Sequence, residues 1–351
     1  MAQIRVGQTT GLSGAVAATV GESNQGALLA IDAANAKGGV NGQKIELISM
    51  DDKFDPKLAV ENARVLIEEK KVSLIFLTRG TPHNVALMPL LEKNHIALLA
   101  PSTGAMVLRN PVNPWIFNVR TPYQVEAQKA IALLSSIGLQ RIGVLQVNDS
   151  FGTDAIVGAQ AGFTNQNLKP QFVEVFERGN PDFKKFVAQT AATQPQAVFI
   201  IGSGTDVIKA VQALRASGSA ARVVTLSNNA SGGFIKQLGA DARGVIMTQV
   251  TPAERNQGDA LVREAYALAK AKGIEELSPA MLEGFMAGKV LVEALQRSGV
   301  SPSREKVRAA LEGIQKFSLG NNLSLSFSAQ DHSGLGFTEL SIIDENGRYL
   351  R

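Results

Sequence analysis

The stretch that decides the fold is Ala197-Val198-Phe199-Ile200-Ile201, which runs directly into Gly202-Ser203-Gly204-Thr205. An unbroken apolar run rich in β-branched residues indicates a strand buried on both faces, as in a parallel sheet covered by helices on each side. The small polar residues that follow are typical of a turn from such a strand into a helix. This segment therefore favours a parallel α/β fold.

The same pattern, a short apolar run followed by a longer amphipathic segment, repeats along the chain. From the second run onward the spacing is roughly 25 residues, the length of one strand–helix–strand unit. The other expected strands are Ile4–Gly7, Ile45–Met50, Val72–Leu77, Ala97–Ala100, Ile116–Val119, Ile142–Val147, Phe172–Phe176, Val223–Leu226 and Val245–Val250. We predict an α/β fold with parallel sheets.

Helix starts are expected where a residue with a capping side chain precedes a proline. The side-chain oxygen accepts a hydrogen bond from a free helix N–H, and proline at the first helical position sacrifices none. These pairs are Asp55-Pro56, Thr81-Pro82, Thr121-Pro122, Asn180-Pro181, Ser278-Pro279 and Ser301-Pro302. Two long helical patterns follow at Asp259–Lys272 and Pro279–Arg297, and two last strands at Leu323–Phe327 and Phe337–Ile343.

Length and composition restrict the class of protein. The chain of 351 residues is longer than one hydrophobic core usually serves, so we expect two lobes. Its 35 Lys and Arg and 31 Asp and Glu residues are scattered, and without a basic stripe we expect no nucleic-acid partner. No apolar run approaches the ~20 residues of a membrane-spanning helix, so we expect no direct membrane insertion.

Residues that carry most catalytic and cofactor chemistry are missing or dispersed. There is no cysteine, and the three histidines, His83, His95 and His332, lie far apart, which excludes thiolate sites and disfavours a histidine metal site. A Gly-x-Ser-x-Gly nucleophile motif and a phosphate loop are both absent. Gly202-Ser203-Gly204 lacks the third glycine of a dinucleotide fingerprint, and no acid follows the next strand. We expect no cofactor, no metal and no enzyme activity.

Polar residues collect instead where the expected strands end. Ligands of parallel sheets bind beyond the carboxyl ends of the strands. Thr81 is expected to cap a helix there, where outward-pointing N–H groups and the helix dipole suit a carboxylate, and Arg79 to pair with that carboxylate. Phe151 and Tyr123 are expected to form a wall against the ligand. These groups suit the binding of a small solute better than proton transfer.

The start of the sequence leaves two locations open. A strand begins at once, at Gln3–Gly7, and no secretory leader precedes it. Either the protein is cytosolic, or the sequence begins just after a removed leader.

Several stretches, taken in their order and spacing, carry a family resemblance over essentially the whole chain. Asn35-Ala36-Lys37-Gly38-Gly39-Val40-Asn41-Gly42 followed by Asp51-Asp52-Lys53-Phe54-Asp55-Pro56 is the most specific part. The others are Gly11-Leu12-Ser13-Gly14, Ala100-Pro101-Ser102-Thr103, Asn148-Asp149-Ser150-Phe151-Gly152 and Leu282-Glu283-Gly284-Phe285. With these, the chain resembles the type I periplasmic solute-binding proteins of the leucine/isoleucine/valine-binding class, which deliver solutes to ABC importers.

The resemblance implies two Rossmann-like lobes with parallel sheets, joined by three crossover strands and closing on a ligand by hinge motion. The first lobe would comprise residues 1–120 and 252–327, and the second 121–251 and 328–351. The crossings would fall near Val119–Thr121, Val250–Thr251 and Phe327–Ser328. The resemblance also implies a monomer in the periplasm, its leader removed, that passes a branched-chain or hydrophobic amino acid, or a related small carboxylate, to the membrane permease of an ABC importer.

Carried over residue by residue, the family's carboxylate-binding hydroxyl falls on Thr81 and its aromatic contact on Phe151. Its contacts after the fourth strand fall on Ser102, Thr103 and Gly104. The other ligand contacts that we expect are Arg79, Tyr123, Ser203, Asn228, Asn229, Ser13 and Glu283.

The sequence departs from the amino-acid binders of this family in two places. They usually have a hydroxyl where this chain has Gly104, and an aromatic and an acid, which hold the ligand's ammonium, near Ser203 and Asn228-Asn229. Burying an ammonium without such a partner is costly. Either Glu126, Asp206 or Glu283 supplies the charge from elsewhere, or the ligand carries no amine.

Two classes of function stay open at this point. One is the importer's solute receptor, and the other is a cytosolic ligand sensor of the amide-regulator type with the same fold. An export leader upstream of Ala2 in the full-length gene favours the receptor, and a native start at Met1 favours the sensor.

Overall fold

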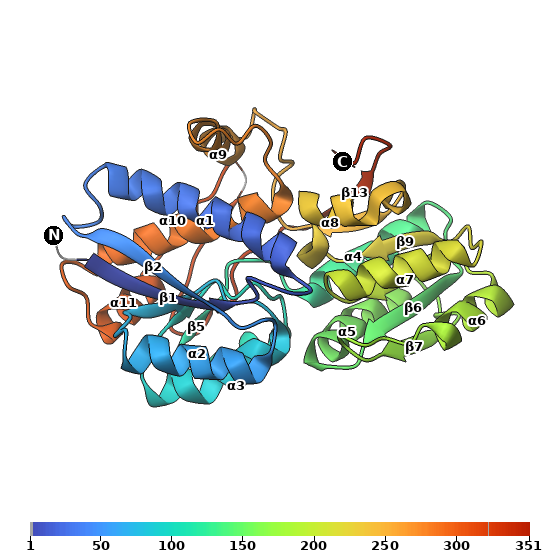
Figure 1. Cartoon of the computed structure of the whole chain (residues 1–351), viewed down its shortest axis with the longest axis horizontal. Coiled ribbons are helices and arrows are strands. Elements are labelled where there is room, and N and C mark those ends of the chain that lie inside the picture. Colours follow the sequence, from blue (N-terminus) through green and yellow to red (C-terminus); the bar gives the residue numbers. More distant parts are fainter. Residues whose placement is uncertain (1–2, 322) are drawn as a thin grey trace. The chain divides into compact units, whose positions relative to one another are not determined.

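The computed structural model describes residues 3–321 and 323–351, which form two compact units. Unit 1 runs to Arg120 and resumes over Thr251–Phe337, whereas unit 2 comprises Thr121–Val250 and Thr338–Arg351. In Figure 1, unit 1 is blue, cyan and orange, and unit 2 is green and yellow with the red C-terminal segment. The chain therefore passes between the units three times.

The third passage lies later in the chain than the expected Phe327–Ser328, because the segment after Phe327 is bound to unit 1. The backbone N–H of Asn118 donates to the carbonyl of His332 at 3.0 Å, and the N–H of Leu335 donates to the carbonyl of Val119 at 2.9 Å. Leu335 is also part of the apolar core of unit 1. The boundary accordingly falls between Phe337 and Thr338.

The sheet of unit 1 has five parallel strands in the order β2-β1-β3-β4-β5. These strands are β1 (Gln3–Thr10), β2 (Lys44–Asp51), β3 (Leu74–Phe76), β4 (Leu98–Leu99) and β5 (Ile116–Phe117). The helices of the unit are α1 (Ala17–Ala36), α2 (Pro56–Glu68), α3 (Thr81–Lys93), η1 (Met106–Leu108), α9 (Ala260–Lys270), α10 (Pro279–Arg297) and α11 (Arg304–Glu312). A small antiparallel pair, β11 (Phe317–Ser318) and β12 (Ser324–Leu325), completes it.

Helices cover both faces of this sheet, which explains why the short strands β3, β4 and β5 are apolar throughout. In β3, Leu74 and Phe76 pack into one core with α1 and α10, whereas Ile75 packs into a second core with α2 and α3. Successive strand residues point to opposite faces, so each face needs its own apolar residue. Figure 1 shows α1 and α10 side by side on one face of the sheet.

The α1–α10 contact depends on a glycine. A Cβ built on Gly284 in α10 would lie 1.8 Å from the carbonyl oxygen of Ser23 in α1. The two backbones are therefore too close for any side chain at this position.

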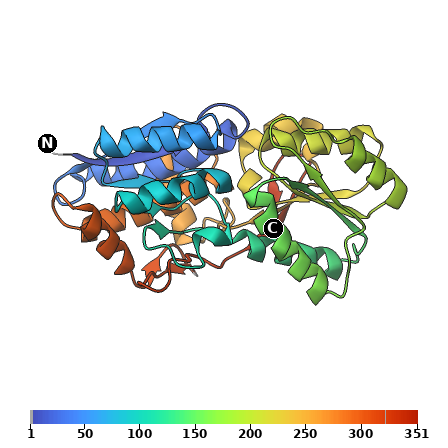
Figure 2. The same cartoon turned by 90° about the horizontal axis from the view of Figure 1, so that it is seen from below.

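The sheet of unit 2 has the strand order β14-β13-β10-β9-β8-β6-β7. Its parallel strands are β6 (Ile142–Val147), β7 (Val173–Phe176), β8 (Ala197–Ile201), β9 (Arg222–Thr225) and β10 (Ile246–Gln249), and β13 (Glu339–Ile343) and β14 (Tyr349–Leu350) add antiparallel. The helices are α4 (Tyr123–Ser136), α5 (Ser150–Asn165), α6 (Lys184–Thr193), α7 (Thr205–Ala216), η2 (Ser227–Asn229), α8 (Gly232–Leu238) and η3 (Gly239–Ala242). In Figure 2 the strands lie between a green layer with α4 and α5 and a yellow layer with α7 and α8.

The α/β fold with parallel sheets is confirmed, but the caps at several helix starts differ from those expected. Asp55 and Ser278 do cap α2 and α10, accepting from the N–H groups of Lys57 and Met281. Ser301 does not cap α11, because the helix begins later and Ser303 is its cap. Thr81 is the first residue of α3 and Gly80 occupies its cap position, whereas Pro122 and not Thr121 occupies the cap position of α4.

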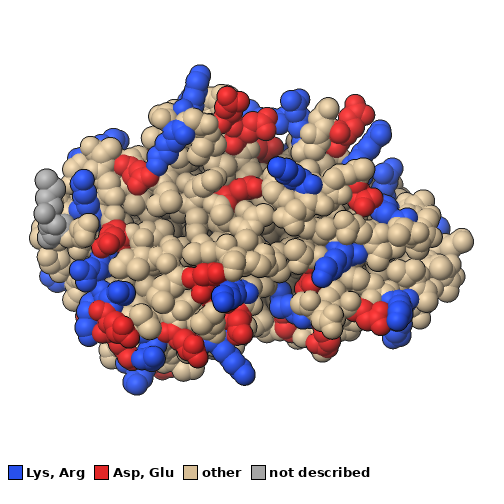
Figure 3. Space-filling view, in the orientation of Figure 1, with Lys and Arg blue, Asp and Glu red and all other residues tan. Residues whose placement is uncertain are grey.

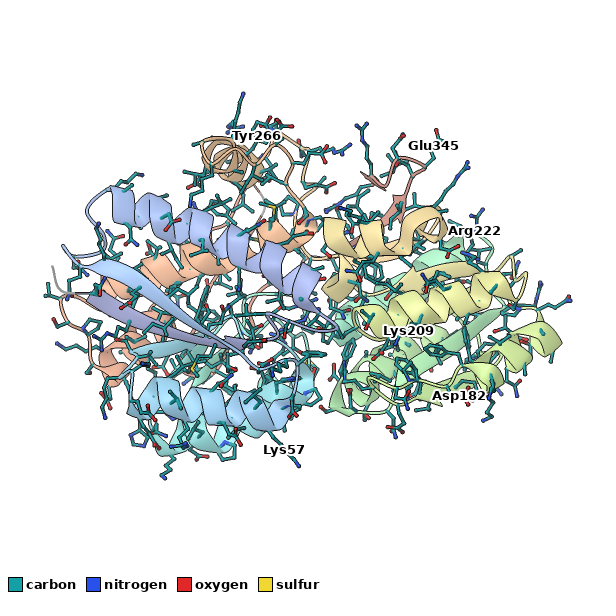
Figure 4. All side chains as sticks on the ribbon, viewed as in Figure 1. Lys57, Asp182, Lys209, Arg222, Tyr266 and Glu345 are labelled. Atoms are coloured by element: carbon teal, nitrogen blue, oxygen red, sulfur yellow. The ribbon has the colours of Figure 1, made fainter. Side chains whose placement is uncertain are left out.

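The helix start at Asn180-Pro181 is also displaced. Helix α6 begins at Lys184, and the backbone N–H of Lys184 donates to the carboxylate of Asp182 at 3.0 Å. Figure 4 labels Asp182 at this turn. A nearby aspartate therefore takes the place that the capping rule assigned to the asparagine.

Candidate functional site

The carboxyl ends of the unit 1 strands carry a buried chain of charged and hydroxyl groups. Arg79 follows β3 and Ser102 follows β4, and the two pair as an isolated parallel bridge. Arg79 Nη1 donates to Ser102 Oγ at 3.3 Å, and Ser102 Oγ donates to Glu283 Oε1 at 3.1 Å. Glu283 also pairs with Arg120, which follows β5, at 3.5 Å. Arg79 is 4% and Arg120 2% exposed, so two guanidinium groups lie out of water around one carboxylate.

Thr81 and Thr103 form a second buried polar group at the same strand ends. Their hydroxyl oxygens lie 2.7 Å apart, and both side chains are buried. Thr81 is the first residue of α3 and not its cap, so its hydroxyl is directed to Thr103 and not to the helix N–H groups. The cap position belongs to Gly80, whose φ of 97° favours glycine. Gly104, which follows Thr103, is buried.

The loop after β2 fixes the position of Ser13. The carboxylate of Asp51 accepts from Ser13 Oγ at 2.5 Å and from the N–H groups of Leu12 and Ser13 at 2.9 and 3.2 Å. Burial of Asp51 opposes its charged form, but these hydrogen bonds and one from Lys53 outweigh it and lower the pKa of Asp51. Ser13 itself is exposed at the same sheet edge.

The pKa of the neighbouring Asp52 is shifted in the opposite direction. It is fully buried, and burial raises its pKa to about 6 although Phe54 N–H and Thr9 Oγ1 donate to it at 2.9 and 3.1 Å. The Phe54 ring stacks on His83 in α3, with 4.5 Å between ring centroids. The Asp52–Phe54 turn thus holds the start of α3 against the end of β2.

In unit 2, amides and a hydroxyl at the ends of β8 and β9 are tied to each other. Asn228 Nδ2 donates to Ser203 Oγ and to the carbonyl of Gly202, both at 3.0 Å. Asn229 Nδ2 donates to the same carbonyl at 3.1 Å, and its Oδ1 accepts from the N–H of Gly204 at 2.9 Å. These residues form a buried, electrically neutral edge.

An aromatic pair lies next to this edge. Tyr123 opens α4 and Phe151 lies in the first turn of α5, with ring centroids 4.6 Å apart and the rings tilted by 51°. Both are buried in the apolar core of unit 2. The α5 start is fixed by Asp149, whose carboxylate accepts from Phe151 N–H at 2.8 Å and from Arg178 Nε at 2.7 Å.

The three acids considered for a ligand's positive charge all accept bonds from the protein. Glu126 accepts from Thr248 Oγ1 at 2.5 Å and from the N–H of Ser227 at 3.2 Å. Asp206 accepts from the N–H of Gly179 at 3.1 Å. Glu283 is engaged by Ser102 and Arg120 as described above.

Two residues of unit 1 that were not expected from the sequence lie beside the expected site residues. Ser23 of α1 lines a small cavity with Arg79 and Ser102, and Arg120 lines a second one with Glu283. Arg120 follows a predicted strand, so the strand-end rule was sufficient to find it. Ser23 lies inside a helical pattern, and no signal in its neighbourhood distinguished it.

A wider groove lies on unit 1 away from the strand ends, between α1, α9 and α10, with about 960 Å³ of empty space. The charged residues facing it include Glu264 and Lys289, which pair with each other at 2.5 Å. The strand ends carry the buried polar groups, and we place the candidate site there and not in this groove.

Charged groups elsewhere form no patch of one sign on the face shown in Figure 3, where Lys and Arg alternate with Asp and Glu. Within residues 3–321 and 323–351, no cluster of three or more His, Asp or Glu side chains has the arrangement of a metal site. None of the helices in the described part of the chain has the length and apolar character needed to cross a membrane.

Known proteins resemble this chain both in sequence and in fold. A family model described as periplasmic binding protein matches residues 3–336. A Pseudomonas aeruginosa protein named amino acid binding protein is 24% identical over 270 residues, which are 73% of this chain and 72% of that protein. The Leu/Ile/Val-binding protein of Escherichia coli K12 is 23% identical over 249 residues, 70% of this chain and 67% of its own. Among solved structures, a substrate-binding periplasmic protein from Ralstonia solanacearum is 31% identical, covers 99% of each chain and has a TM-score of 0.91.

Proposed function

The chain belongs to the periplasmic binding protein family, and from this premise we propose that it is the extracytoplasmic solute receptor of an ABC importer. Its solute is a branched-chain or hydrophobic amino acid or a related small carboxylate. The names of the Pseudomonas and Escherichia coli relatives support the amino-acid class.

The observation that carries the proposal is the buried Thr81–Thr103 hydroxyl pair at the start of α3, beside Arg79 and Ser102. Free N–H groups and the positive end of the dipole at a helix start favour an anion. Hydroxyl groups and a guanidinium complete a donor set for a carboxylate. The site residues of the proposal are Thr81, Ser102, Thr103, Gly104, Arg79, Ser13 and Glu283 in unit 1, and Phe151, Tyr123, Ser203, Asn228 and Asn229 in unit 2.

We infer that the two units close on the solute as hinged lobes. Closure would exclude water and bring the polar strand ends of both sheets onto one small molecule. The short passages between the units, each a single chain segment, suit a hinge. The proposed role is binding without chemical conversion, and the names of the two relatives support it, since both are those of binding proteins.

We propose a periplasmic location and, as partner, the membrane permease of the importer. The competing role is that of a cytosolic ligand sensor with the same fold. Cell fractionation of the full-length gene product separates the two: an export leader and recovery in the periplasm support the receptor, and a cytosolic product supports the sensor.

Binding itself is tested by native mass spectrometry of the purified protein and a thermal-shift screen of amino acids and small carboxylates. A ligand at one hundred times its Kd adds about 2.7 kcal/mol to the free energy of unfolding, which raises Tm by several degrees. Absence of any shift across both classes would overturn the proposal. Chemical turnover of a bound solute would replace it with an enzyme.

A further inference from the structure

We propose that unit 1 carries a second binding site, in the groove between α1, α9 and α10, for a small amphipathic acid with an apolar chain and one carboxylate. This groove lies away from the polar strand ends, and the inference goes beyond the proposed function and does not depend on it. It follows from the stripes of side chains that line the groove and from one ammonium group that has no counter-charge.

Each of the three helices presents one stripe of residues to the groove. In α1 and α10 the lining residues follow the i, i+3, i+4, i+7 spacing, which places side chains on one face of a helix. Figure 1 shows α9 close to both helices. The lining residues are Ala30, Ala33, Ala34 and Lys37 along α1 and its C-cap, Lys289, Val292, Glu293 and Gln296 in α10, and Glu264 and Leu268 in α9.

The middle of the groove is apolar. The α1 residues that line it there are alanines, so α1 leaves a hollow beside the larger side chains of its neighbours. Leu268, Val292 and Phe317 of β11 pack against the core of unit 1 but are only partly buried. The empty space of about 960 Å³, open mouth included, matches small-molecule sites of up to ~1,000 Å³. An apolar chain therefore gains free energy by lying here.

Both carboxylates that line the groove are already paired with a cation. Glu264 Oε2 in α9 and Lys289 Nζ in α10 lie 2.5 Å apart and connect the two helices. Glu293 pairs with Arg297 Nε one turn further along α10, at 2.6 Å. These side chains bring no net charge to a ligand.

The ammonium group of Lys37 is not paired. Among residues 3–321 and 323–351, no carboxylate lies within ion-pair distance of it, and the side-chain amide of Gln296 makes no hydrogen bond. Asn41 Nδ2 donates to the carbonyls of Leu295 and Gln296 at 3.3 and 3.0 Å. The chain after α1 is thus bound to the end of α10, so Lys37 and Gln296 lie at the same end of the groove.

The arrangement selects the chemistry of the ligand. From Lys289 to Gln296, α10 rises by about 10 Å, which suits an acyl chain of medium length such as that of octanoate. With the chain over the alanines, a carboxylate at the far end accepts hydrogen bonds from Lys37 and Gln296. A cationic head group would instead meet the Lys37 ammonium, and a neutral one would gain only the apolar contact.

The first experiment compares head groups on one chain. Isothermal titration calorimetry of the whole protein at pH 7.5 would use octanoate, octanol and octylammonium, with acetate as the acid that has no chain. We expect octanoate to bind about threefold or more tighter than octanol and about tenfold or more tighter than octylammonium, and acetate to give no measurable heat. No binding of octanoate, or equal binding of octylammonium or acetate, overturns the inference.

The second experiment removes the charge at the end of the groove. Lys37→Gln should lower octanoate affinity about threefold or more, leave octanol affinity unchanged and abolish the weakening of octanoate binding by added salt. Lys57→Gln is the matched control, because Lys57 is an exposed lysine of unit 1 outside the groove and is labelled in Figure 4. If Lys37 served only the end of α1, its loss would lower Tm and leave octanoate affinity unchanged, and that result overturns the inference.

The third experiment fills the apolar middle. Ala34→Phe should lower the affinity for both octanoate and octanol by about tenfold or more, because the new ring occupies the space of the chain. Ala161→Phe, at an exposed alanine of α5, is the control. If Ala34→Phe does not fold, Lys37→Gln still decides the matter. Equal losses in the Ala34 and Ala161 variants, or none in either, contradict the site.

These results separate the groove from the strand ends. Octanoate affinity that is lost in Thr81→Val but retained in Lys37→Gln and Ala34→Phe would place the acid at the strand ends, overturn the groove site and leave the proposed function standing. Octanoate binding that depends on Lys37 and Ala34, in a protein that binds no amino acid or small carboxylate, would support the groove site and overturn the proposed function.

Discussion

The hydroxyl oxygens of Thr81 and Thr103 lie 2.7 Å apart, with both side chains buried at the ends of neighbouring strands. Each hydroxyl can donate only one hydrogen, so one of the pair donates to the other and the second hydrogen is left for a further acceptor. A carboxylate oxygen is such an acceptor. Because both groups are uncharged, one of these hydroxyls can be removed by mutation without changing the charge of the site.

Thr81→Val removes that hydroxyl at nearly constant volume. We expect affinity for an acidic solute to fall by more than about tenfold with the fold retained, measured by calorimetry and by circular dichroism. Thr190→Val is the control, because Thr190 is also buried but donates to Phe186 within α6. Loss of affinity in both variants, or in neither, would remove Thr81 from the site.

Asp52 should make stability fall as pH rises. Its folded-state pKa of about 6 lies above the ordinary aspartate pKa of 3.8. Between pH 3.8 and about 6 the folded protein therefore binds a proton that the unfolded chain has lost, and the stability gained from this proton is lost at higher pH. Asp52→Asn should therefore raise stability at pH 7 by about 1–2 kcal/mol, with no gain below pH about 4. Urea unfolding at several pH values measures this.

Asp51 provides the control of opposite sign for that experiment. Its pKa is lowered by hydrogen bonds that outweigh the effect of burial, so its contribution is present at neutral pH and is lost as pH falls through the folded-state pKa. Asp51→Asn should destabilise the protein at pH 7 and less so in acid. If the free energy of unfolding changed with pH in the same way in Asp51→Asn and Asp52→Asn, the opposite pKa shifts of the two residues would be contradicted.

The cap of α11 can be located by two serines two positions apart. Ser303→Ala removes the side chain that accepts from Lys306 N–H, and we expect a loss of about 1 kcal/mol. Ser301→Ala should cost less than half as much, because Ser301 makes no cap. Denaturant unfolding of the two variants checks this, and a larger loss at Ser301 would return the cap to the position expected from the sequence.

Gly284→Ala should be strongly destabilising, by about 3 kcal/mol or more, because its Cβ would lie 1.8 Å from the Ser23 carbonyl oxygen. Gly21→Ala is the matched control. Gly21 is an exposed glycine of α1 whose Cβ would meet no atom within 4 Å, and the change should stabilise the protein by about 0.5–1 kcal/mol. Equal effects in thermal unfolding would contradict the close α1–α10 packing.

The fold class could be predicted from the sequence, because the strands of a covered parallel sheet are marked by short local patterns of residues. Continuous apolar runs such as Ala197–Ile201 mark strands buried on both faces, and this run coincides with β8. Order and spacing of the motifs also identified the family correctly. Side-chain direction was less predictable: Thr81 precedes a proline as a cap would, yet its hydroxyl turns to a residue in another loop.

The site was only partly predictable, since its remaining parts depend on contacts between distant segments. Ser23 became a candidate only because α1 packs its helix face against the end of β3. The late third boundary depends on His332 and Leu335 bonding back to the β5 segment. Neither contact leaves a local pattern in the chain.

The pairing of α1 with α10 has a consequence for biosynthesis. These helices lie on either side of the entire 121–250 insertion in chain order, so the apolar side of α1 emerges from the ribosome long before its neighbour exists. The central insertion can collapse while translation continues, whereas the amino-terminal segment waits, exposed, for residues near 280. Nascent chains paused between these two points are where a holdase chaperone has most to protect.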